Sequence, residues 1–566
     1  MEEIKENLAE LLAKYVEIGE DDLIELIEEA PENIGADLAL PCFGLSKILK
    51  KDPREIAGEL EDKINLNEND LFSEIETKGP YLNFFLDVEK FTEEVLEKIL
   101  IDGGNYGRRS NIEKTAVVEF PAPNTNKPLH VGHLRNMALG ESISRLLESQ
   151  GYDVNRVNLY NDRGIHICQS MLGYKKWGEG KEPDKKPDHF VGDYYVKFNQ
   201  KAERNPSLKE EAQEMLRDWE KGDPDTVELW KKMNKWVYEG HNKTYNKFGV
   251  SFDKIYYESD TYEKGKEIIE DGLEKDLFYE DETGAVKVDV GNLGEKVLIR
   301  SDGTSVYITQ DLYLAEAKYQ DFNFDRSIYV VGNEQNYHFK VLFKIFDMLD
   351  KKYAGNCYHL SYGMVNLPEG KLKSREGKVV DADDLIDELV GMAKEEVKKR
   401  NDMSGSELVN LAEKIGLGAL KFFLLKFTAS KDFTFQPEES VSFEGETGPY
   451  IQYSYVRAKR ILEKSDKEIG DIDFSLLIKP EEKLLIKKMN KFPDILSEAT
   501  ESYDPHVLAK YAFELASEFS SFYEKHPVID AENKDLEKAR LALVKAFSYV
   551  IKSSLYLLGV ESPKKM

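Results

Sequence analysis

Residues 119–136 read EFPAPNTNKPLHVGHLRN, and this stretch decides the fold. The segment Thr115 to Phe120 that leads into it is apolar and β-branched, which predicts a short buried strand. Leu134 to Ser149 predicts a helix. A strand, an irregular turn and a helix N-terminus form the usual place where an α/β sheet holds a nucleotide, because unpaired N–H groups and the helix dipole favour phosphate.

Two histidines and a lysine in this turn are the first candidate ligand-binding residues. His130 and His133 could contact a phosphate, and Gly132 between them leaves room for a flat base. The pattern His-x-Gly-His is short enough to arise by chance. The predicted strand before it, the predicted helix after it and Lys127 three residues upstream argue against chance.

Composition limits the class of protein. Of the 566 residues 41% are hydrophobic, so roughly two to four packed domains are expected. No apolar run approaches the roughly 20 residues that cross a bilayer. Cys42, Cys168 and Cys357 are too scattered for a zinc site or a disulfide framework, so we expect a cytoplasmic protein without a protein-bound metal. The formal charge of −29 argues only weakly against nucleic acid, since the field at a binding face matters more.

Three domains are expected. Residues 1–105 form a small α+β module, 106–440 an α/β domain and 441–566 an all-α bundle. In the first module Phe84 and Phe85 lie on an aromatic strand, where they could stack on RNA bases or simply fill the core.

The middle domain has the pattern of a doubly wound, Rossmann-type sheet. A second strand-like segment, Asp153 to Tyr160, follows the first predicted strand and helix, and a strand–helix–strand unit of about 45 residues is a parallel crossover. Residues 175–245 contain all four tryptophans and many charged residues, which predicts an inserted helical region. This insertion shows no catalytic pattern.

Polar residues follow two further predicted strands. Val306 to Thr309 has strand composition, and Asp311 is placed to cap the next predicted helix. A strand over Ser327 to Val331 runs towards Gln335. Because ligands of open α/β sheets gather at the carboxyl ends of strands, Glu119, Asp311 and Gln335 are candidates for one pocket.

The last part of the chain offers a second phosphate candidate and a basic helix. Residues 371–378 follow a predicted strand, His359 to Val365, and carry four basic residues, which could cover a polyphosphate or form an ordinary solvated hairpin tip. From about residue 400 onward the apolar spacing predicts helices, with a bundle beginning near Gly445. The predicted helix from Tyr450 to Arg460 interleaves tyrosine with Arg and Lys, which suits RNA contact and equally helix packing.

In combination these segments resemble, in order along the chain, the signatures of arginyl-tRNA synthetases, a class I aminoacyl-tRNA synthetase family. The matching segments are residues 123–136, 300–311, 335–338, 371–377, 447–453 and 539–544. The resemblance covers essentially the whole chain, and the set of motifs is highly specific. It implies that 1–105 contacts the outer corner of tRNA and that 441–566 binds the anticodon.

The resemblance implies a two-step reaction. L-arginine and ATP, supplied as its Mg²⁺ complex, give arginyl-adenylate and diphosphate, and the arginyl group then moves to the 2′-hydroxyl of the terminal adenosine of tRNA(Arg). Catalysis would rest on orientation and on stabilising charge at the α-phosphate. The family also implies that adenylate formation requires bound tRNA, and we expect a monomer.

Site residues carry over by position. Those implied for ATP are His130, Gly132, His133, Met364, Val365, Lys371 and Ser374, with catalytic roles for His130, His133, Lys127 and Lys371. Those implied for arginine are Glu119, Asn124, Glu258, Tyr307, Asp311 and Gln335. Those implied for tRNA are Tyr450, Gln452, Tyr453 and Arg457. A planar guanidinium with five donors calls for carboxylates and a phenol, although a helix cap, a strand filler and a surface acid would explain Asp311, Tyr307 and Glu258 equally simply.

One position departs from the wider class. The class loop reads Lys-Met-Ser-Lys-Ser, and its second lysine neutralises the leaving diphosphate, whereas this chain has Ser374 at that position. A lysine just before the His-x-Gly-His is thought to substitute in this family, and Lys127 is placed for that role. Lys373 or Arg375 could contribute instead.

Two other functions fit part of the sequence. A related nucleotidyltransferase could make an adenylate without tRNA, but it would have no use for the helical C-terminus or the N-terminal module. An inactive relative could only hold tRNA, but the retention of both histidines, Lys127, Tyr307 and Asp311 argues against it.

Overall fold

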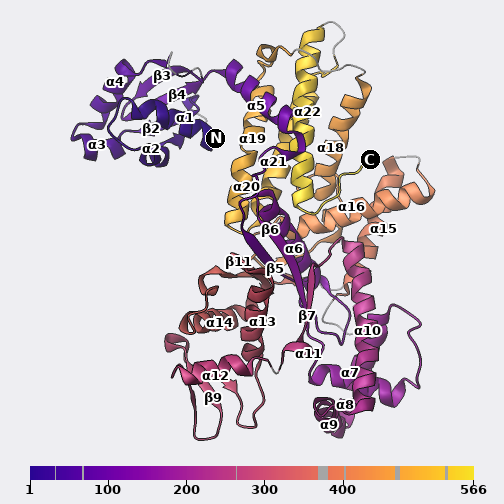
Figure 1. The fold of residues 1–566 in the computed structure, drawn as a ribbon. Coiled ribbons are helices and arrows are strands. Elements are labelled where there is room, and N and C mark those ends of the chain that lie inside the picture. Colours follow the sequence, from indigo (N-terminus) through magenta and orange to yellow (C-terminus); the bar gives the residue numbers. More distant parts are fainter. Residues whose placement is uncertain are drawn as a thin grey trace. The chain divides into compact units, whose positions relative to one another are not determined.

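The computed structural model describes residues 1–31, 34–66, 69, 71–262, 264–366, 380–400, 403–465, 472–529 and 533–566 (Figure 1). The described residues form two compact units. The first contains Met1–Gly107, Ser454–Ser497 and Tyr511–Ser553. The second contains Arg108–Tyr453, Glu498–Lys510 and Ser554–Met566. None of the described helices has the length and apolarity needed to cross a membrane.

A five-stranded parallel sheet organises the second unit. Its strands, in spatial order, are β12 (Cys357–Tyr362), β11 (Arg326–Gly332), β5 (Thr115–Glu119), β6 (Asp153–Tyr160) and β7 (Lys254–Tyr257). The chain leaves β5 for β6 on one side, and β11 pairs with the other side of β5, so the strand order reverses between β5 and β11. This confirms the doubly wound α/β prediction and places the expected ligand crevice at the carboxyl ends of β5 and β11.

Helix α6 (Val131–Ser149) carries the histidines and packs against this sheet. It begins at Val131, before the predicted start at Leu134, because His130 already caps its first turn. Gly140 lies against the ring of Phe120, and a side chain at position 140 would collide with that ring. The close approach fixes the helix beside the end of β5 (Figure 1).

The segment 175–245 is helical, as predicted. It extends a group of helices: α7 (Ile165–Trp177), α8 (Pro187–Arg204), α9 (Ser207–Glu220) and α10 (Pro224–Phe248). They surround their own apolar core, in which Trp236 makes edge-on contacts with Tyr174 and Phe190 at ring separations of 5.5 and 5.6 Å. Trp219 and Trp230 also contact each other, so these tryptophans serve packing.

A second insertion was not predicted. After α11 (Glu258–Thr261) come α12 (Lys266–Glu274) and a three-stranded antiparallel sheet of β8 (Phe278–Glu280), β9 (Val286–Asp289) and β10 (Glu295–Ile299), in the order β10-β9-β8. The strand predicted at Val306 to Thr309 is wrong, because helix α13 (Tyr307–Phe322) begins at Tyr307. Ile308, Leu312 and Ala315 are buried at helical spacing, and that tertiary pattern outweighs the β-branched composition.

The remaining elements of the second unit are mainly helical. They are α14 (Asn336–Met348), α15 (Ala382–Arg400), α16 (Gly405–Leu425), α17 (Pro437–Ser440) and the short parallel pair β13 (Val365–Asn366) and β14 (Phe433–Thr434). The single strand predicted over His359 to Val365 is therefore divided between β12 and β13.

The first unit contains the predicted α+β module. Its sheet has the order β1-β2-β4-β3, with β1 (Glu28–Glu29), β2 (Leu38–Pro41), β3 (Phe72–Lys78) and β4 (Tyr81–Leu86). Its helices are α1 (Glu2–Ala13), α2 (Glu20–Leu26), α3 (Phe43–Leu49), α4 (Pro53–Lys63) and α5 (Val88–Asp102). Asp52 caps α4, accepting from the Arg54 N–H at 2.9 Å. Phe84 is fully buried, which favours its interpretation as core.

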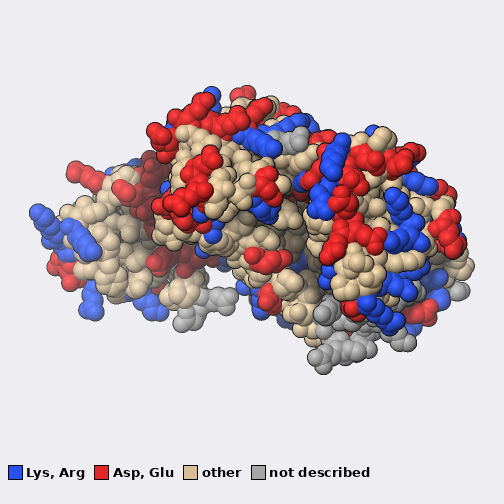
Figure 2. Space-filling view, turned by 90° about the horizontal axis from the view of Figure 1, so that it is seen from below, with Lys and Arg blue, Asp and Glu red and all other residues tan. Residues whose placement is uncertain are grey.

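Helices dominate the C-terminal part of the chain. They are α18 (Gly448–Lys464), α19 (Pro480–Asn490), α20 (Phe492–Glu501), α21 (Pro505–Lys525) and α22 (Lys534–Leu557). All but α20 were predicted from apolar spacing, so the all-α prediction is confirmed. Figure 2 shows acidic and basic side chains intermixed on one face of the molecule, as 107 Asp and Glu against 78 Lys and Arg would lead one to expect.

Candidate functional site

The two histidines form a reciprocal cap at the start of α6. The His130 Nδ1 accepts from the Gly132 N–H at 3.1 Å, and the His133 Nδ1 accepts from the His130 N–H at 3.1 Å. The ring centroids are 3.9 Å apart. Two N–H groups at the helix start, which have no partner within the helix, therefore donate to imidazoles. In most helices a carboxylate or hydroxyl is the acceptor at these positions.

These hydrogen bonds fix the protonation of both rings. Burial and the neighbouring Lys127 ammonium lower the pKa of His130 to about 4. Burial, followed by the nearby His130, His241 and Lys127, lowers the pKa of His133 well below its usual value. Both imidazoles are neutral at pH 7, and since each Nδ1 accepts, each Nε2 carries the proton. The cap therefore presents two neutral N–H donors to a ligand.

Gly132 is required by the imidazole of His130. A Cβ at position 132 would lie 2.9 Å from His130 Cε1 and 3.0 Å from Nδ1. The sequence prediction assigned this free space to adenine, but the ring of His130 already uses it. Gly132 thus sets the position of the His130 ring.

Gly132→Ala should lower the rate of ATP activation by about 10-fold or more while leaving the fold intact, because the methyl group displaces the His130 ring from its cap. ATP-dependent diphosphate exchange measures the rate, and thermal unfolding measures the fold. An unchanged rate would show that the ring tolerates the shift.

Two asparagines hold the loop between β5 and α6. Asn158 lies in β6, and Asn161 directly follows this strand. The Asn161 side chain donates to the Ala122 carbonyl at 2.9 Å, and its main chain bonds Pro123 and Thr125. Asn158 accepts from the Ala122 N–H at 3.2 Å. Asn124, in the middle of this loop, is left exposed. Its amide is therefore presented to solvent by a rigid backbone, as a ligand-binding group requires.

Lys127 lies half-buried beside the histidines. Burial lowers the pKa of its ammonium, and no carboxylate of the described residues offsets this effect. Its carbonyl oxygen lies 3.2 Å from Nε2 of the buried His241 of α10. A desolvated, unpaired lysine beside a helix N-terminus is suited to receive an anion.

Glu119 ends β5 in a buried ion pair. Its Oε2 accepts from the Lys318 Nζ at 2.8 Å, and the exposed side-chain fractions are 7% and 0%. The same ammonium lies 3.7 Å from the ring centroid of Tyr329. Sequence reasoning missed Lys318, although it follows Asp311 by seven residues and so shares its helix face. One oxygen of Glu119 is committed to this pair, and the other is left for a ligand.

Asp311 lies against an imidazole. Its Oδ2 is 2.6 Å from the Nε2 of His338, which lies in the first turn of α14. Burial opposes the charge on His338, but the hydrogen bond and the charge of Asp311 outweigh it and raise the pKa of His338. Because α13 begins at Tyr307, Asp311 is in its second turn and is not the helix cap that the sequence suggested.

Tyr307 and Glu258 are the other residues predicted to surround a guanidinium together with Asp311. Tyr307 is four residues before Asp311 on α13, so both lie on one face, and the phenol is 74% exposed. Glu258 is buried, and burial raises its pKa to about 7, with Arg163 lowering it and Asp162 and Asp311 raising it. The alternative that Glu258 is an ordinary surface acid is therefore wrong, because its side chain is buried. Arg163 and Asp162 were missed by sequence reasoning.

The main chain near β13 requires a correction. The Met364 N–H donates to Asp432 Oδ1 at 2.6 Å, and its carbonyl accepts from the Phe433 N–H at 3.2 Å. The N–H is occupied, so Met364 could offer an adenine only the second lone pair of its carbonyl. In the parallel ladder the N–H and C=O of Val365 point away from β14. The prediction of a main-chain contact with adenine therefore rests mainly on Val365.

Arg135 joins α6 to this segment and was not predicted as a site residue. Its side chain is fully buried, and the guanidinium donates to the carbonyls of Gly363, Lys431 and Ala429. Burial lowers its pKa to about 10. Arg135 thus holds the residues that precede Val365 to the histidine-bearing helix.

Other predicted residues lie in different surroundings. Gln335 is exposed just after β11, at the expected crevice. Lys371 and Ser374 lie outside the described residues. On α18, Tyr450 and Tyr453 are half-buried, and Arg457 lies 4.9 Å from the ring centroid of Tyr523. Gln452 is fully buried and donates to the carbonyls of Lys414 and Glu561, so its prediction as a tRNA contact is corrected to a packing role.

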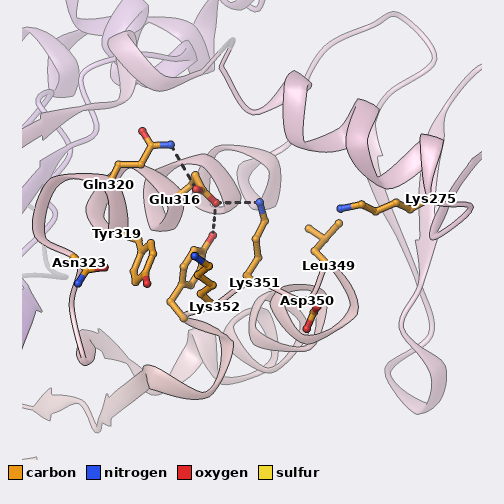
Figure 3. A pocket seen from close by; sticks show the side chains of 10 residues that line it. Lys275, Glu316, Tyr319, Gln320, Asn323, Leu349, Asp350, Lys351 and Lys352 are labelled. Carbon is orange, nitrogen blue, oxygen red and sulfur yellow. Dashed lines mark hydrogen bonds and ion pairs between the residues drawn. The ribbon is translucent and has the colours of Figure 1, made fainter.

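A cavity of about 500 Å³ lies away from these residues, at the far end of α13 (Figure 3). Glu316 lines this cavity and accepts from Lys351 at 3.0 Å and from the Tyr353 hydroxyl at 3.1 Å. The chain enters β11 directly after α13, so this end lies at the amino ends of the strands. Ligands of this fold bind at the opposite end.

A parallel sheet with a strand-order reversal, a histidine-capped helix at that point and acidic side chains on β5 and α13 are features of the catalytic domain of a class I aminoacyl-tRNA synthetase. Three family models match: the class I (R) tRNA synthetase catalytic domain over residues 95–436, the DALR anticodon-binding domain over 451–566 and the arginyl-tRNA synthetase N-terminal domain over 2–86.

Similar proteins agree along the full length. An arginine–tRNA ligase of Treponema denticola is 45% identical, with 94% of this chain and 93% of the relative covered. One from Porphyromonas gingivalis is 41% identical, with 95% of each covered. The arginyl-tRNA synthetase structure of Thermus thermophilus superimposes with a TM-score of 0.84 at 27% identity, covering 100% of this chain and 99% of that one. The chain belongs to the arginyl-tRNA synthetase family.

Proposed function

We propose that this protein joins L-arginine to tRNA(Arg) through an arginyl-adenylate, with transfer to the 2′-hydroxyl of the terminal adenosine. Mg²⁺–ATP is the substrate complex that supplies the energy. The observation that carries the proposal is the contact of Asp311 with His338 at 2.6 Å, since a carboxylate that faces an imidazole nitrogen can accept from a guanidinium in its place.

The histidine cap serves ATP. His130 and His133 each direct a neutral Nε2–H towards phosphate oxygens. They therefore bind the phosphates without adding a positive charge that would retain the diphosphate product. Lys127 supplies the positive charge as diphosphate leaves, and Val365 meets the adenine edge. These donors are preorganised by main-chain hydrogen bonds, which is the arrangement that stabilises a developing anion most effectively.

The acidic residues serve arginine. Asp311 and the Tyr307 phenol receive the guanidinium, and Glu258 adds a second carboxylate when it is ionised. Glu119, Asn124 and Gln335 receive the α-amino and α-carboxyl groups. The substrate's α-carboxylate then points towards the histidine cap, because both sets of residues lie at the carboxyl end of the same sheet.

Three regions divide the work on tRNA and catalysis. Residues 1–105 contact tRNA, 106–440 carry out the chemistry and 441–566 read the anticodon region, in agreement with the positions of the three family models. Tyr450, Tyr453 and Arg457 remain the proposed tRNA contacts. Buried or half-buried free cysteines support the proposed cytoplasmic location, and the protein is proposed to act as a monomer.

ATP–diphosphate exchange with each amino acid, with and without total tRNA, tests the proposal. Exchange with arginine that depends on tRNA is expected. Exchange with another amino acid in the absence of tRNA would indicate a different nucleotidyltransferase, and no exchange with any amino acid would indicate a tRNA-binding relative.

The affinity for arginine should rise with pH. Below the raised pKa of His338 the imidazolium competes with the guanidinium for Asp311, and below a pKa of about 7 Glu258 is uncharged. Both changes favour arginine as pH increases through this range, by at most about 10-fold per pH unit for each proton. The KM for arginine measured from pH 6 to about 8.5 checks this. In His338→Asn the slope should be shallower, and an identical slope would exclude His338 as the competitor.

A further inference from the structure

A buried group of charges joins the helical insertion to the segment beside the histidine cap. In the cluster, Lys186 and His189 of the α8 region face Asp188, Asp381 and Asp383. The Lys186 Nζ lies 2.6 Å from Asp383 Oδ2 and 2.9 Å from Asp188 Oδ2. Asp188 is fully buried, and the exposed side-chain fractions of Lys186 and Asp383 are 19% and 16%.

Asp383 receives donors from two helices of the insertion. Besides Lys186, the His189 Nε2 lies 3.2 Å from its Oδ2, and the Thr244 hydroxyl of α10 donates to its Oδ1 at 3.1 Å. Burial opposes ionisation of Asp383, but His189 and Lys186 outweigh it and lower its pKa. The carboxylate is therefore anchored as a charged group at the first turn of α15.

Three carboxylate and imidazole ligands within one cluster also suggest a cation site, formed by Asp188, His189 and Asp383. The Lys186 ammonium lies between the two carboxylates at hydrogen-bonding distance from both. It supplies the positive charge that a metal ion would bring. Asp188 and Asp383 are thus paired with Lys186 as an ion-pair network.

The residues just before Asp383 are bonded to the histidine cap. The Val131 N–H donates to the Val380 carbonyl at 3.0 Å, and the Ala382 N–H donates to the Leu129 carbonyl at 3.0 Å. His130 and Asp381 face each other as an antiparallel bridge. Any displacement of Asp383 is therefore passed directly to the backbone of His130.

The same helices also contact the other side of the cap. His241 of α10 lies 3.2 Å from the Lys127 carbonyl oxygen. Gly192 of α8 lies so close to Pro128 that a Cβ there would be 2.8 Å from the proline Cδ. The insertion thus holds residues 127–131 directly and also through Asp383.

We propose that Lys186 and Asp383 are positioning residues for adenylate formation. Through them the 175–245 insertion sets the place of Lys127 and His130, although neither residue touches a substrate. The proposal rests on the proposed roles of Lys127 and His130 in ATP activation. It gives the insertion a task in catalysis beyond its packing.

The test compares Asp383→Asn and Lys186→Met with Asp387→Asn. Asp387 pairs with Lys247 and so links the same helices, α15 and α10, but at an exposed position away from the 380–382 bridge. With full-length protein, kcat for arginine-dependent diphosphate exchange should fall about 10- to 100-fold in the two cluster variants. The KM for arginine and the affinity for tRNA(Arg) should stay near wild type. Asp387→Asn should retain wild-type kcat.

Rescue separates positioning from a loss of stability. Lys186→Arg keeps the charge near Asp383 and should recover much of the rate, and all assays run below the onset of thermal unfolding. If Lys186→Met does not fold, His189→Gln and Thr244→Val each remove one bond to Asp383 and decide the question through the same kcat. A folded cluster variant with the kcat of Asp387→Asn would overturn the proposal. Wild-type protein without arginine exchange would instead refute the proposed function.

Discussion

Asp311→Asn is expected to lower kcat/KM for arginine by roughly 100-fold, or about 3 kcal/mol, with most of the change in KM. The substitution keeps the shape of the side chain but removes the charge that would face a permanent guanidinium cation. It also releases His338, whose Nε2 is 2.6 Å from Asp311 in the empty pocket. An uncharged amide does not offset the free-energy cost of desolvating the guanidinium.

The control for this prediction is Glu316→Gln. Glu316 is a carboxylate on the same helix, but its partners are Lys351 and Tyr353 at the opposite end of α13. Arginine-dependent diphosphate exchange at varied arginine and varied ATP measures both constants. The KM for ATP should change little in either variant. An unchanged KM for arginine in Asp311→Asn would remove Asp311 from the pocket.

Lys127→Ala is expected to depress adenylate formation by about 100-fold, an effect comparable to the removal of a donor that stabilises a developing anion. Ser374 stands where the wider class has the lysine that neutralises the departing diphosphate. Lys127 lies beside the histidine cap, and no described carboxylate offsets the burial that lowers its pKa. A bound triphosphate would favour the charged form of the Lys127 ammonium, which burial disfavours.

Single-turnover adenylation and tRNA binding are measured separately for this variant. A fall in the adenylation rate with tRNA affinity preserved supports the role of Lys127. Equal losses in both would make Lys127 a tRNA contact. Lys373→Ala and Arg375→Ala serve as comparisons, because a larger loss in either would assign the compensating charge to that residue instead.

Local patterns were enough to predict the centre of the molecule. The apolar run of β5, the spacing of α6 and the strand of β6 each depend on neighbours in sequence, and they place the His-x-Gly-His at a sheet edge. The four C-terminal helices predicted from periodicity are present for the same reason. The three-stranded sheet β8–β10 was missed, because strands of 3 to 5 residues carry weak periodic signals. Helix α15 was also missed, although its buried residues Leu385, Ile386 and Leu389 have helical spacing.

The candidate site was predicted less completely than the fold. Glu119, Asp311 and Gln335 were placed by the rule that ligands gather at strand ends, but their partners Lys318 and His338 come from other elements. Met364 and Gln452 were assigned to ligands by motif position, and only the structure shows that the Met364 N–H and the Gln452 Nε2 are already bonded. Motif spacing carries no information on which hydrogen bonds are occupied.

The sequence alone determined the family, the reaction that the resemblance implies and the positions of the two histidines, since these follow from residue types at fixed spacing in several motifs along the chain. Only the tertiary structure decided the state of those residues. The tautomers of His130 and His133, the pairing of Asp311 with His338 and the anchoring of the cap by Asp383 all arise between elements distant in sequence. Burial and charge depend on what surrounds a side chain in space, and neighbours along the chain do not specify it.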